Sequence, residues 1–247
     1  MAQVNKTFLG LADIYLKPFG GSGGHRPIGS VSTCQLTHSE EEVRARNYGI
    51  DGGTLSSVRR LDQVGVSLTL QSLSIPNLTQ ALRGTAQSIE SGTVTAAEYT
   101  ATPGELIRLP HVAPTSVSVT GASGTPTYVA GTDYKVTGAG IVPLEGGAIT
   151  AASTVEISYS YGAQQIVQAL TSGAAEYSLV FDGVNEAENN QVVVVDLHRI
   201  KFGLPESMDL IGDEFATLTI PGELLLDATQ TGAGVSRFYR WTYPGSV

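Results

Sequence analysis

The chain has 247 residues, of which 41% are hydrophobic and only 15% are charged, and its formal net charge is −9. This composition excludes an intrinsically disordered chain and a long solvated helical rod. The acidic balance argues against tight DNA binding, because nucleic-acid binders neutralise phosphates with a basic patch. The 29 glycines, together with recurring Thr, Ser and Val, favour many short strands joined by tight turns.

Two further features bear on where the protein resides. The opening residues Met1 to Lys6 contain no apolar signal region, and no stretch approaches the roughly 20 apolar residues of a membrane span. Cys34 is the single cysteine, so we expect no internal disulfide but an ordinary packed or half-exposed strand residue. We therefore expect a protein that is made in a cytoplasm and stays soluble until it assembles.

Strand patterns dominate the first part of the chain. The segments Thr7 to Phe19 and Ile28 to Arg46 predict strands, with the flexible loop Gly20 to Gly24 between them. Asn47 to Ser57 predicts a long polar loop with turn residues at its tip. A strict alternation follows, in which one face consists of Val64, Val66, Leu68 and Leu70, and the other of Gly65, Ser67, Thr69 and Gln71.

One short helix is expected after this strand. Ser74 is the candidate N-cap, and Pro76 lies in the first turn. Residues at i, i+3 and i+4 form an apolar stripe of Leu78, Ala81 and Leu82, and Gly84 ends the helix.

The composition shifts near Ile89. Residues 89–165 have few charges, many threonines and closely spaced turns, which predict a small inserted antiparallel β-sandwich of immunoglobulin-like type. Longer strands resume over Gln191 to Phe202 and Glu214 to Leu226, where Pro221 argues for an interruption or an edge position. The predicted fold is therefore mainly β, with a discontinuous core (residues 1–88 and 166–247) and an insert (residues 89–165).

Catalytic and metal motifs are weak. Gly20 to Gly24 matches the G-x-S-x-G pattern around Ser22, but that chemistry needs a strand-to-helix turn, and a strand is expected here. No two of the four histidines, His25, His38, His111 and His198, have metal-ligand spacing. The acidic segment Asp182 to Asn190 is interpreted as a hairpin connection, with a weak calcium site as the alternative. We expect no catalytic residue, metal or cofactor.

The order of features resembles that of a known family. The core pattern consists of Phe8 to Leu16, Pro27 to Val31, Leu36 to Arg46, Asp51-Gly52-Gly53, Ser57 to Arg60, Gly65 to Leu73, Ile75 to Leu78 and Leu82 to Gly84. It resembles the tail tube proteins of long-tailed bacteriophages, especially those with non-contractile tails. The insert is also similar to a segment of some of these proteins, through Gly104 to Pro110, Gly131 to Tyr134, Leu144 to Gly147 and Ser158 to Tyr161.

The resemblance implies a β-sandwich flanked by a helix and related to the tube protein of type VI secretion. Six subunits would join their sheets into a β-barrel ring, and rings would stack head to tail into the conduit for genome delivery. The partners would be other copies, the tape measure protein and DNA in the lumen, and the tail terminator and tail tip proteins. The location would be the virion tail, after synthesis in the host bacterial cytoplasm.

Two sets of residues are assigned within this architecture. The loop from about Arg44 to Ser57 would reach the neighbouring ring, with candidates Arg44, Arg46, Asn47, Tyr48, Asp51, Gly52 and Gly53. Polar strand faces and nearby acids are predicted to face the lumen or a water-filled surface: Ser67, Thr69, Gln71, Thr217, Thr219, Glu40, Glu42 and Asp62. Two alternatives remain, a phage capsid decoration or host-surface adhesion protein, and an esterase built on Ser22.

Overall fold

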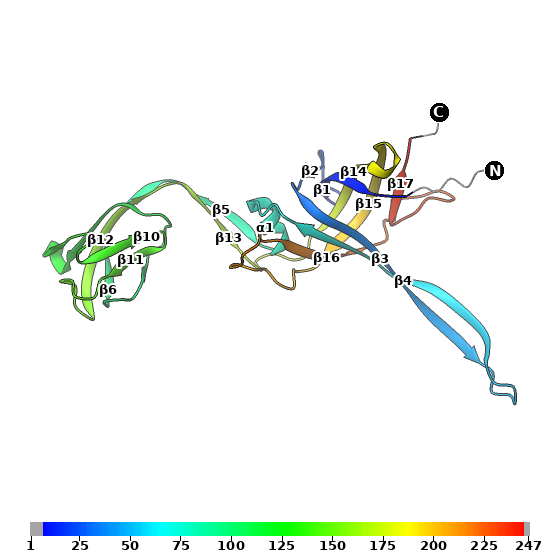
Figure 1. Ribbon diagram of the computed structural model, residues 1–247, viewed down its shortest axis with the longest axis horizontal. Helices are drawn as coiled ribbons and strands as arrows, with labels where there is room; N and C mark the ends of the chain where they lie inside the picture. Colours follow the sequence, from blue (N-terminus) through cyan, green and yellow to red (C-terminus); the bar gives the residue numbers. More distant parts are fainter. Residues whose placement is uncertain (1–6, 245–247) are drawn as a thin grey trace. The chain divides into compact units, whose positions relative to one another are not determined.

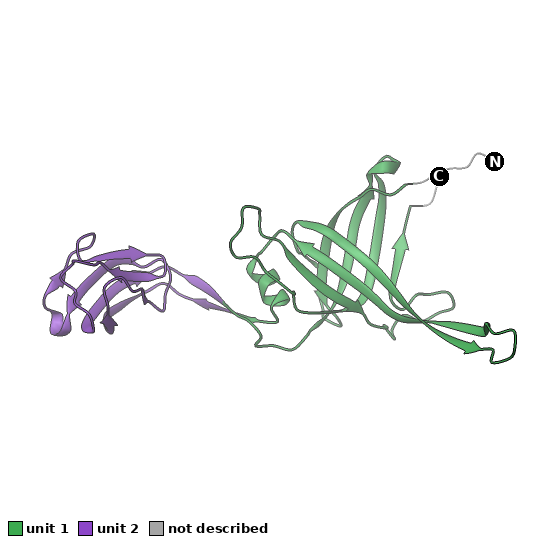
Figure 2. Cartoon of the chain, turned by 60° about the horizontal axis from the view of Figure 1, so that its bottom comes forward, with its two compact units in different colours: residues 1–85, 167–247 green, residues 86–166 purple. Residues whose placement is uncertain are grey.

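The computed structural model describes residues 7–244, which form two compact units. Unit 1 comprises residues 1–85 and 167–247, and unit 2 comprises residues 86–166 (Figures 1 and 2). The insert expected from composition covered residues 89–165, within three residues of unit 2 at either end. The opening segment Met1 to Lys6, where no signal region was expected, lies outside the described residues.

The mainly β fold with one short helix is confirmed. Unit 1 is built on one antiparallel sheet of eight strands. They are β1 (Gly10–Pro18), β2 (Arg26–Pro27), β3 (Val31–Arg46), β4 (Thr54–Leu70), β14 (Glu176–Asn185), β15 (Gln191–Phe202), β16 (Leu218–Leu224) and β17 (Tyr239–Thr242). The order is β2-β1-β14-β15-β16-β4-β3, and β17 pairs with β15 outside this path.

Strand β15 is the point at which the sheet forks. One edge pairs with β14, while the other pairs first with β17, over Val194 to Leu197, and then with β16, over Ile200 to Phe202. A hydrogen bond of 3.0 Å between His38 on β3 and the Tyr239 hydroxyl on β17 links the two branches. One branch consists of β16, β4 and β3, and the other is β17. Leu218 of β16, Val66 of β4 and Tyr239 of β17 all belong to one apolar core.

The alternation predicted for β4 is confirmed. Val64, Val66, Leu68 and Leu70 are all buried, and the core-facing Leu218, Ile220 and Leu224 continue this surface on β16. Burying each such side chain contributes about 1.5–3 kcal/mol, so the apolar face holds these strands in register. Cys34 is half-buried beside this face, and burial raises the pKa of its thiol to about 11.

The helix α1 (Ile75–Ala81) begins after Ser74 as expected, although the Ser74 side chain makes no capping hydrogen bond. Ala81 is buried in the core. Asn77 is also buried, which its polarity did not predict. Its Nδ2 donates to the carbonyls of Ile28 (2.7 Å) and Ser72 (2.8 Å), and its Oδ1 accepts from Arg26 (2.9 Å). These bonds satisfy the buried amide and fasten the helix to the loops beside it.

Unit 2 has its own core between two sheets. The larger has the order β6-β12-β8-β9 and the smaller β10-β11-β7. Their strands are β6 (Gly92–Ala101), β7 (Ile107–Arg108), β8 (Thr115–Gly121), β9 (Thr127–Tyr128), β10 (Tyr134–Thr137), β11 (Gly140–Pro143) and β12 (Ser153–Tyr161), with a 3-10 turn at Ala122–Gly124. Val119, Ile157 and Tyr159 of the larger sheet pack with Ile141 of the smaller one.

Two short strands carry the chain out of unit 1 and back. They are β5 (Thr85–Ile89) and β13 (Gln164–Gln168), and they pair only with each other among the described residues.

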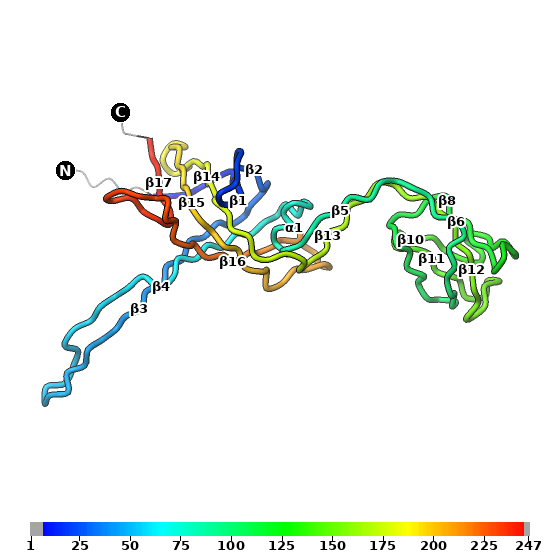
Figure 3. Tube along the Cα trace, turned by 180° about the vertical axis from the view of Figure 1, so that it is seen from behind, coloured from blue at the N-terminus to red at the C-terminus, as the bar shows by residue number. Residues whose placement is uncertain are grey.

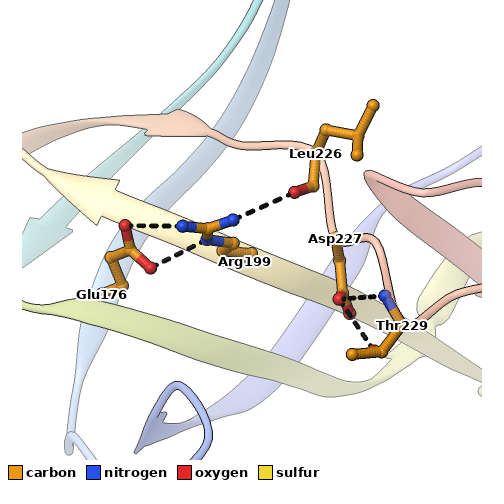
Figure 4. A network of polar contacts seen from close by, with 5 residues as sticks. All are labelled: Glu176, Arg199, Leu226, Asp227 and Thr229. Atoms are coloured by element: carbon orange, nitrogen blue, oxygen red, sulfur yellow. Dashed lines mark hydrogen bonds and ion pairs between the residues drawn. The ribbon is translucent and has the colours of Figure 1, made fainter.

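An arginine ties the segment after β16 to the sheet. Arg199 on β15 holds Glu176 on β14 with two hydrogen bonds, from Nε (2.8 Å) and Nη2 (3.0 Å), and its Nη1 donates to the Leu226 carbonyl (3.3 Å; Figure 4). The next residue, Asp227, is buried and accepts from the amide (2.9 Å) and hydroxyl (2.8 Å) of Thr229. The bond from Arg199 lowers the pKa of Glu176, although burial opposes it.

The substitution Glu176→Gln tests this ion pair. Because the folded-state pKa of Glu176 is lowered, the pair stabilises the protein above the unfolded-state pKa of about 4.3 and loses this contribution as the pH falls through the folded-state value. We expect a loss of stability at neutral pH that becomes smaller at acidic pH, as Glu176 is protonated in the wild-type chain. Urea unfolding followed by the fluorescence of Trp241, the single tryptophan, measures it. An equal difference at both pH values would contradict the assignment.

Replacing residues 89–165 with a short Gly-Ser linker tests the independence of unit 1. None of its buried core residues lies in that segment, so the shortened chain should still unfold cooperatively. Trp241 lies in unit 1, so its fluorescence reports on unit 1 alone. Residues 89–165 expressed by themselves are the matched control. Loss of cooperative unfolding would show that the segment is integral to unit 1.

Candidate functional site

A polar surface runs across β3, β4 and β16, on the face of the sheet opposite the core. The register aligns Thr33, Thr69 and Thr219 in one row across the three strands. The Thr69 and Thr219 hydroxyls are 3.1 Å apart and hydrogen-bonded. Ser67 lies in the next row, beside Pro221. The structure therefore brings together three of the residues that the sequence singled out as polar faces: Ser67, Thr69 and Thr219.

Gln71 and Thr217 lie at the margins of this polar surface. Gln71 follows β4, and its Oε1 accepts a hydrogen bond of 2.8 Å from the Ser30 hydroxyl. Thr217 precedes β16, so the strand begins later than the alternation from Glu214 suggested. It lines a hollow of about 320 Å³ whose other walls are Ser67, Glu206, Ser207, Asp209, Thr219 and Pro221.

Pro221 lies inside β16 and not at a break in the strand. It pairs with Ser67 of β4, whereas pairing with β15 begins only at Gly222. The Pro221 carbonyl accepts a hydrogen bond from the Gly203 amide (2.7 Å), one residue past the end of β15, so Pro221 lies at the end of that pairing, where a missing N–H is tolerated.

Of the three candidate acids, Asp62 lies on the same side of the sheet as the polar surface, whereas Glu40 and Glu42 do not. Asp62 is the extra residue of a bulge, where the register passes from Ser39–Gln63 to Glu40–Leu61, and it accepts a hydrogen bond of 2.9 Å from the Ser39 hydroxyl. Strand alternation then places Glu40 and Glu42 on the side of β3 opposite Ser39. The bulge itself gives no clear signal in the sequence, but it lies in β4, so the alternation of β3 alone separates Glu40 and Glu42 from Ser39.

The expected loop from Arg44 to Ser57 is largely a hairpin. Strand β3 continues to Arg46 and β4 starts at Thr54, so only residues 47–53 form the turn. Arg44 and Arg46 are strand residues. The predicted end of the first strand at Arg46 is confirmed, whereas the start of β4 at Thr54 falls inside the segment predicted as a loop. Cross-strand pairing continues through Val43–Val58 and Ala45–Ser56.

Local hydrogen bonds shape the hairpin turn. The Asn47 side chain accepts from the Gly49 amide (2.8 Å), and the Asn47 amide donates to the Gly53 carbonyl (2.9 Å). Gly52 and Gly53 have φ of +60° and +91°, a conformation that favours glycine. The turn leaves the Tyr48 side chain 92% exposed and Ile50 fully exposed.

The hairpin beyond the bulge lacks support from the rest of unit 1. Every residue from Thr54 to Gln63 is exposed, and Figure 2 shows the two strands running out past the other strands of unit 1. Its exposed apolar residues are Val43, Tyr48, Ile50, Leu55, Val58 and Leu61. Tyr48 is one of the candidates for the contact with the neighbouring ring, whereas the five aliphatic residues are not among them.

Charges along this hairpin are partly paired. Glu42 accepts from Arg44 at 2.6 Å and lies 3.8 Å from Arg59. The hydrogen bond from Arg44 lowers the pKa of Glu42, and the carboxylate raises the pKa of Arg44. Arg46 and Arg60 form no ion pair within residues 7–244.

The weak catalytic and metal motifs occupy unremarkable places. Ser22 lies between β1 and β2, a strand-to-strand connection and not the strand-to-helix turn that the esterase alternative requires. His25 bonds the Ser178 hydroxyl (3.1 Å), and His111 bonds the Tyr159 hydroxyl (2.9 Å). Asp182 and Asn185 belong to β14, and a 3-10 turn at Glu186–Glu188 completes that hairpin.

Within residues 7–244, no group of three or more His, Cys, Asp or Glu could hold a metal ion. Nor does this part of the chain contain a helix long and apolar enough to cross a membrane.

Comparison with known proteins adds one finding. A family model described as "Protein of unknown function UCP028589" matches residues 7–242, which is nearly the whole chain. No curated protein matches it.

Proposed function

The chain belongs to UCP028589, a family of proteins of unknown function, and we propose that it is the tail tube protein of a long-tailed, non-contractile bacteriophage. In this proposal the chain forms hexameric rings that stack head to tail and enclose the conduit through which the genome enters the host cell. The tape measure protein and DNA occupy the lumen, and the tail terminator and tail tip proteins cap the two ends. The protein has a structural role and catalyses no reaction.

The observation that carries this proposal is the unsupported hairpin. An isolated two-stranded hairpin is marginally stable in water, so a long one with exposed apolar side chains implies a partner surface. The hairpin provides Val43 and Val58 along its strands and Tyr48 and Ile50 at its turn. A head-to-tail contact through this hairpin cannot close in a dimer and therefore propagates as a filament.

Open sheet edges support joining of the sheets within a ring. Strand β3 is the terminal strand of its branch, and its outer edge has no partner strand among the described residues. It is 16 residues long, so it leaves many backbone groups unpaired. Long open edges pair indiscriminately, and closing them between copies removes that hazard.

The polar surface suits a lumen through which DNA must pass. The neutral hydroxyls of Ser67, Thr69 and Thr219 have no positive charge to hold phosphates. We assign this surface to the lumen, with Gln71 and Thr217 at its margins. Unit 2, which has a core of its own, would lie outside the channel as a decoration.

Electron microscopy of the purified protein tests the assignment. The wild-type chain should form hollow tubes or six-fold rings as its concentration rises. The double variant Tyr48→Asp/Ile50→Asp should stop stacking, because it charges the hairpin turn that would be buried. The matched control Ser91→Asp/Thr95→Asp places the same charges on unit 2 and should assemble normally. A wild-type chain that stays monomeric would favour the alternative, a capsid decoration or adhesion protein.

The triple variant Ser67→Lys/Thr69→Lys/Gln71→Lys tests the lumen assignment. It should still assemble, because the surface is polar and open, but its tubes should retain short duplex DNA at low salt. Particles built with it should lose infectivity by roughly tenfold or more, since each added cation strengthens phosphate binding. The control Thr93→Lys/Thr100→Lys/Ser118→Lys carries the same charge on unit 2. Normal infectivity of the first variant would rule out this lumen surface.

A further inference from the structure

The connection between β15 and β16 carries an unusual combination of side chains. Residues 203–217, here called the acidic loop, contain four carboxylates and no cation: Glu206, Asp209, Asp213 and Glu214. None of these carboxylates forms an ion pair with any residue between 7 and 244. The same loop exposes Leu210 (83%), Ile211 (97%) and Phe215 (98%).

The acidic loop is anchored, so this exposure is not simply that of a loose segment. The Gly203 amide donates to the Pro221 carbonyl (2.7 Å), and Arg83 donates to the carbonyl of Phe202 (2.9 Å) just before the loop. Met208 packs against the core of unit 1. With Met208 directed inward, the residues from Leu210 to Phe215 are left outside. Three large apolar side chains in one short stretch indicate a surface that another molecule covers.

The outer part of the hairpin has the complementary chemistry. Residues 43–60 contain Arg44, Arg46, Arg59 and Arg60 against one acid, Asp51, a formal charge of +3, while Glu40, Glu41 and Glu42 lie at the base of the hairpin. Glu42 pairs with Arg44 and lies 3.8 Å from Arg59, so Arg46 and Arg60 are the arginines that form no ion pair within residues 7–244. The acidic loop has a formal charge of −4. Both surfaces also expose apolar side chains among these charges. The two surfaces are therefore opposite in charge, and each has apolar side chains that the other could cover.

The two surfaces of one chain cannot meet. Ser67 lines the hollow beside Glu206 and Asp209, whereas Thr54 marks the hairpin end of the same strand, β4. Thirteen residues of strand separate them, which is about 40 Å at about 3.3 Å per residue. Figures 1 and 3 show the acidic loop near α1, on the side of unit 1 away from the hairpin turn. The matching surface must therefore come from a second copy.

We propose that the hairpin of one copy, residues 43–60, docks on the acidic loop, residues 203–217, of a copy in the next ring. Arginines of the hairpin pair with Asp209, Asp213 and Glu214, while Tyr48 and Ile50 cover Leu210, Ile211 and Phe215. This inference rests on the proposed tube function and specifies which surface receives the hairpin. A contact between two different patches repeats in one direction, as stacking of rings requires.

Reversing the charges tests the pairing directly. One variant carries Arg44→Glu, Arg46→Glu, Arg59→Glu and Arg60→Glu, so its hairpin and its loop are both acidic. A second carries Asp209→Lys, Asp213→Lys and Glu214→Lys, so both surfaces are basic. Neither should stack alone, with the assembly concentration raised at least tenfold. An equimolar mixture should co-assemble, because each hairpin then meets a loop of opposite charge.

Two controls accompany the mixture, which is followed by sedimentation and electron microscopy. Glu90→Lys/Glu98→Lys/Glu105→Lys makes the same charge change as the loop variant, but on unit 2, and should stack like the wild type. Trp241 fluorescence checks that each variant is folded, and co-assembly itself requires folded chains.

Each outcome decides the proposal. Restored stacking in the mixture supports it. A loop-reversal variant that stacks like the wild type, or folded variants whose mixture stays unassembled, overturns it. If the wild type forms tubes and Tyr48→Asp/Ile50→Asp blocks them while loop reversal has no effect, the tube function stands and only this receiving surface is wrong. If the wild type never forms tubes or rings, both proposals fall.

Discussion

The division of β15 between two sets of partners is the constraint on which unit 1 depends. Because β17 and β16 take successive parts of the same edge, the sheet separates into two branches that enclose one core. The hydrogen bond between His38 and Tyr239 links their outer strands. This arrangement buries one face of β16 and of the adjoining part of β4 and leaves the other face free to be polar. It also leaves β3 at the end of its branch, where it can extend beyond the core as a hairpin.

Much of this fold could be predicted from sequence, because strand alternation is set by burial. The row from Val64 to Leu70 alternates strictly, and each of its apolar members is buried. The helix was found from its spacing and from Pro76. Asn77 was not, since a buried amide looks like a surface residue until its three hydrogen bonds are seen. The burial of Asn77 depends on hydrogen-bond partners in other segments of the chain, which a local sequence pattern does not reveal.

The candidate site was less predictable, for reasons that differ between residues. Ser67, Thr69 and Thr219 come together because strand register follows from the buried face of the same strands. Glu40 and Glu42 lie on the other side of β3, where period-2 alternation from Ser39 places them, and the bulge at Asp62 of β4 does not alter this. The first strand of the hairpin was predicted up to Arg46, but the start of the second at Thr54 was taken for part of a polar loop. In a strand that projects from the core, charged and apolar residues are both exposed, so burial imposes no alternation that a sequence pattern could reveal.

The pairing of β5 with β13 has an evolutionary consequence. The chain leaves unit 1 and rejoins it at two strands that lie side by side, so the residues between them act on the core as a single closed loop. The free energy of closing such a loop grows only with the logarithm of its length. A lineage can therefore lengthen, shorten, lose or exchange unit 2 with little effect on the core, and the surface of unit 2 can diverge while unit 1 keeps its core residues.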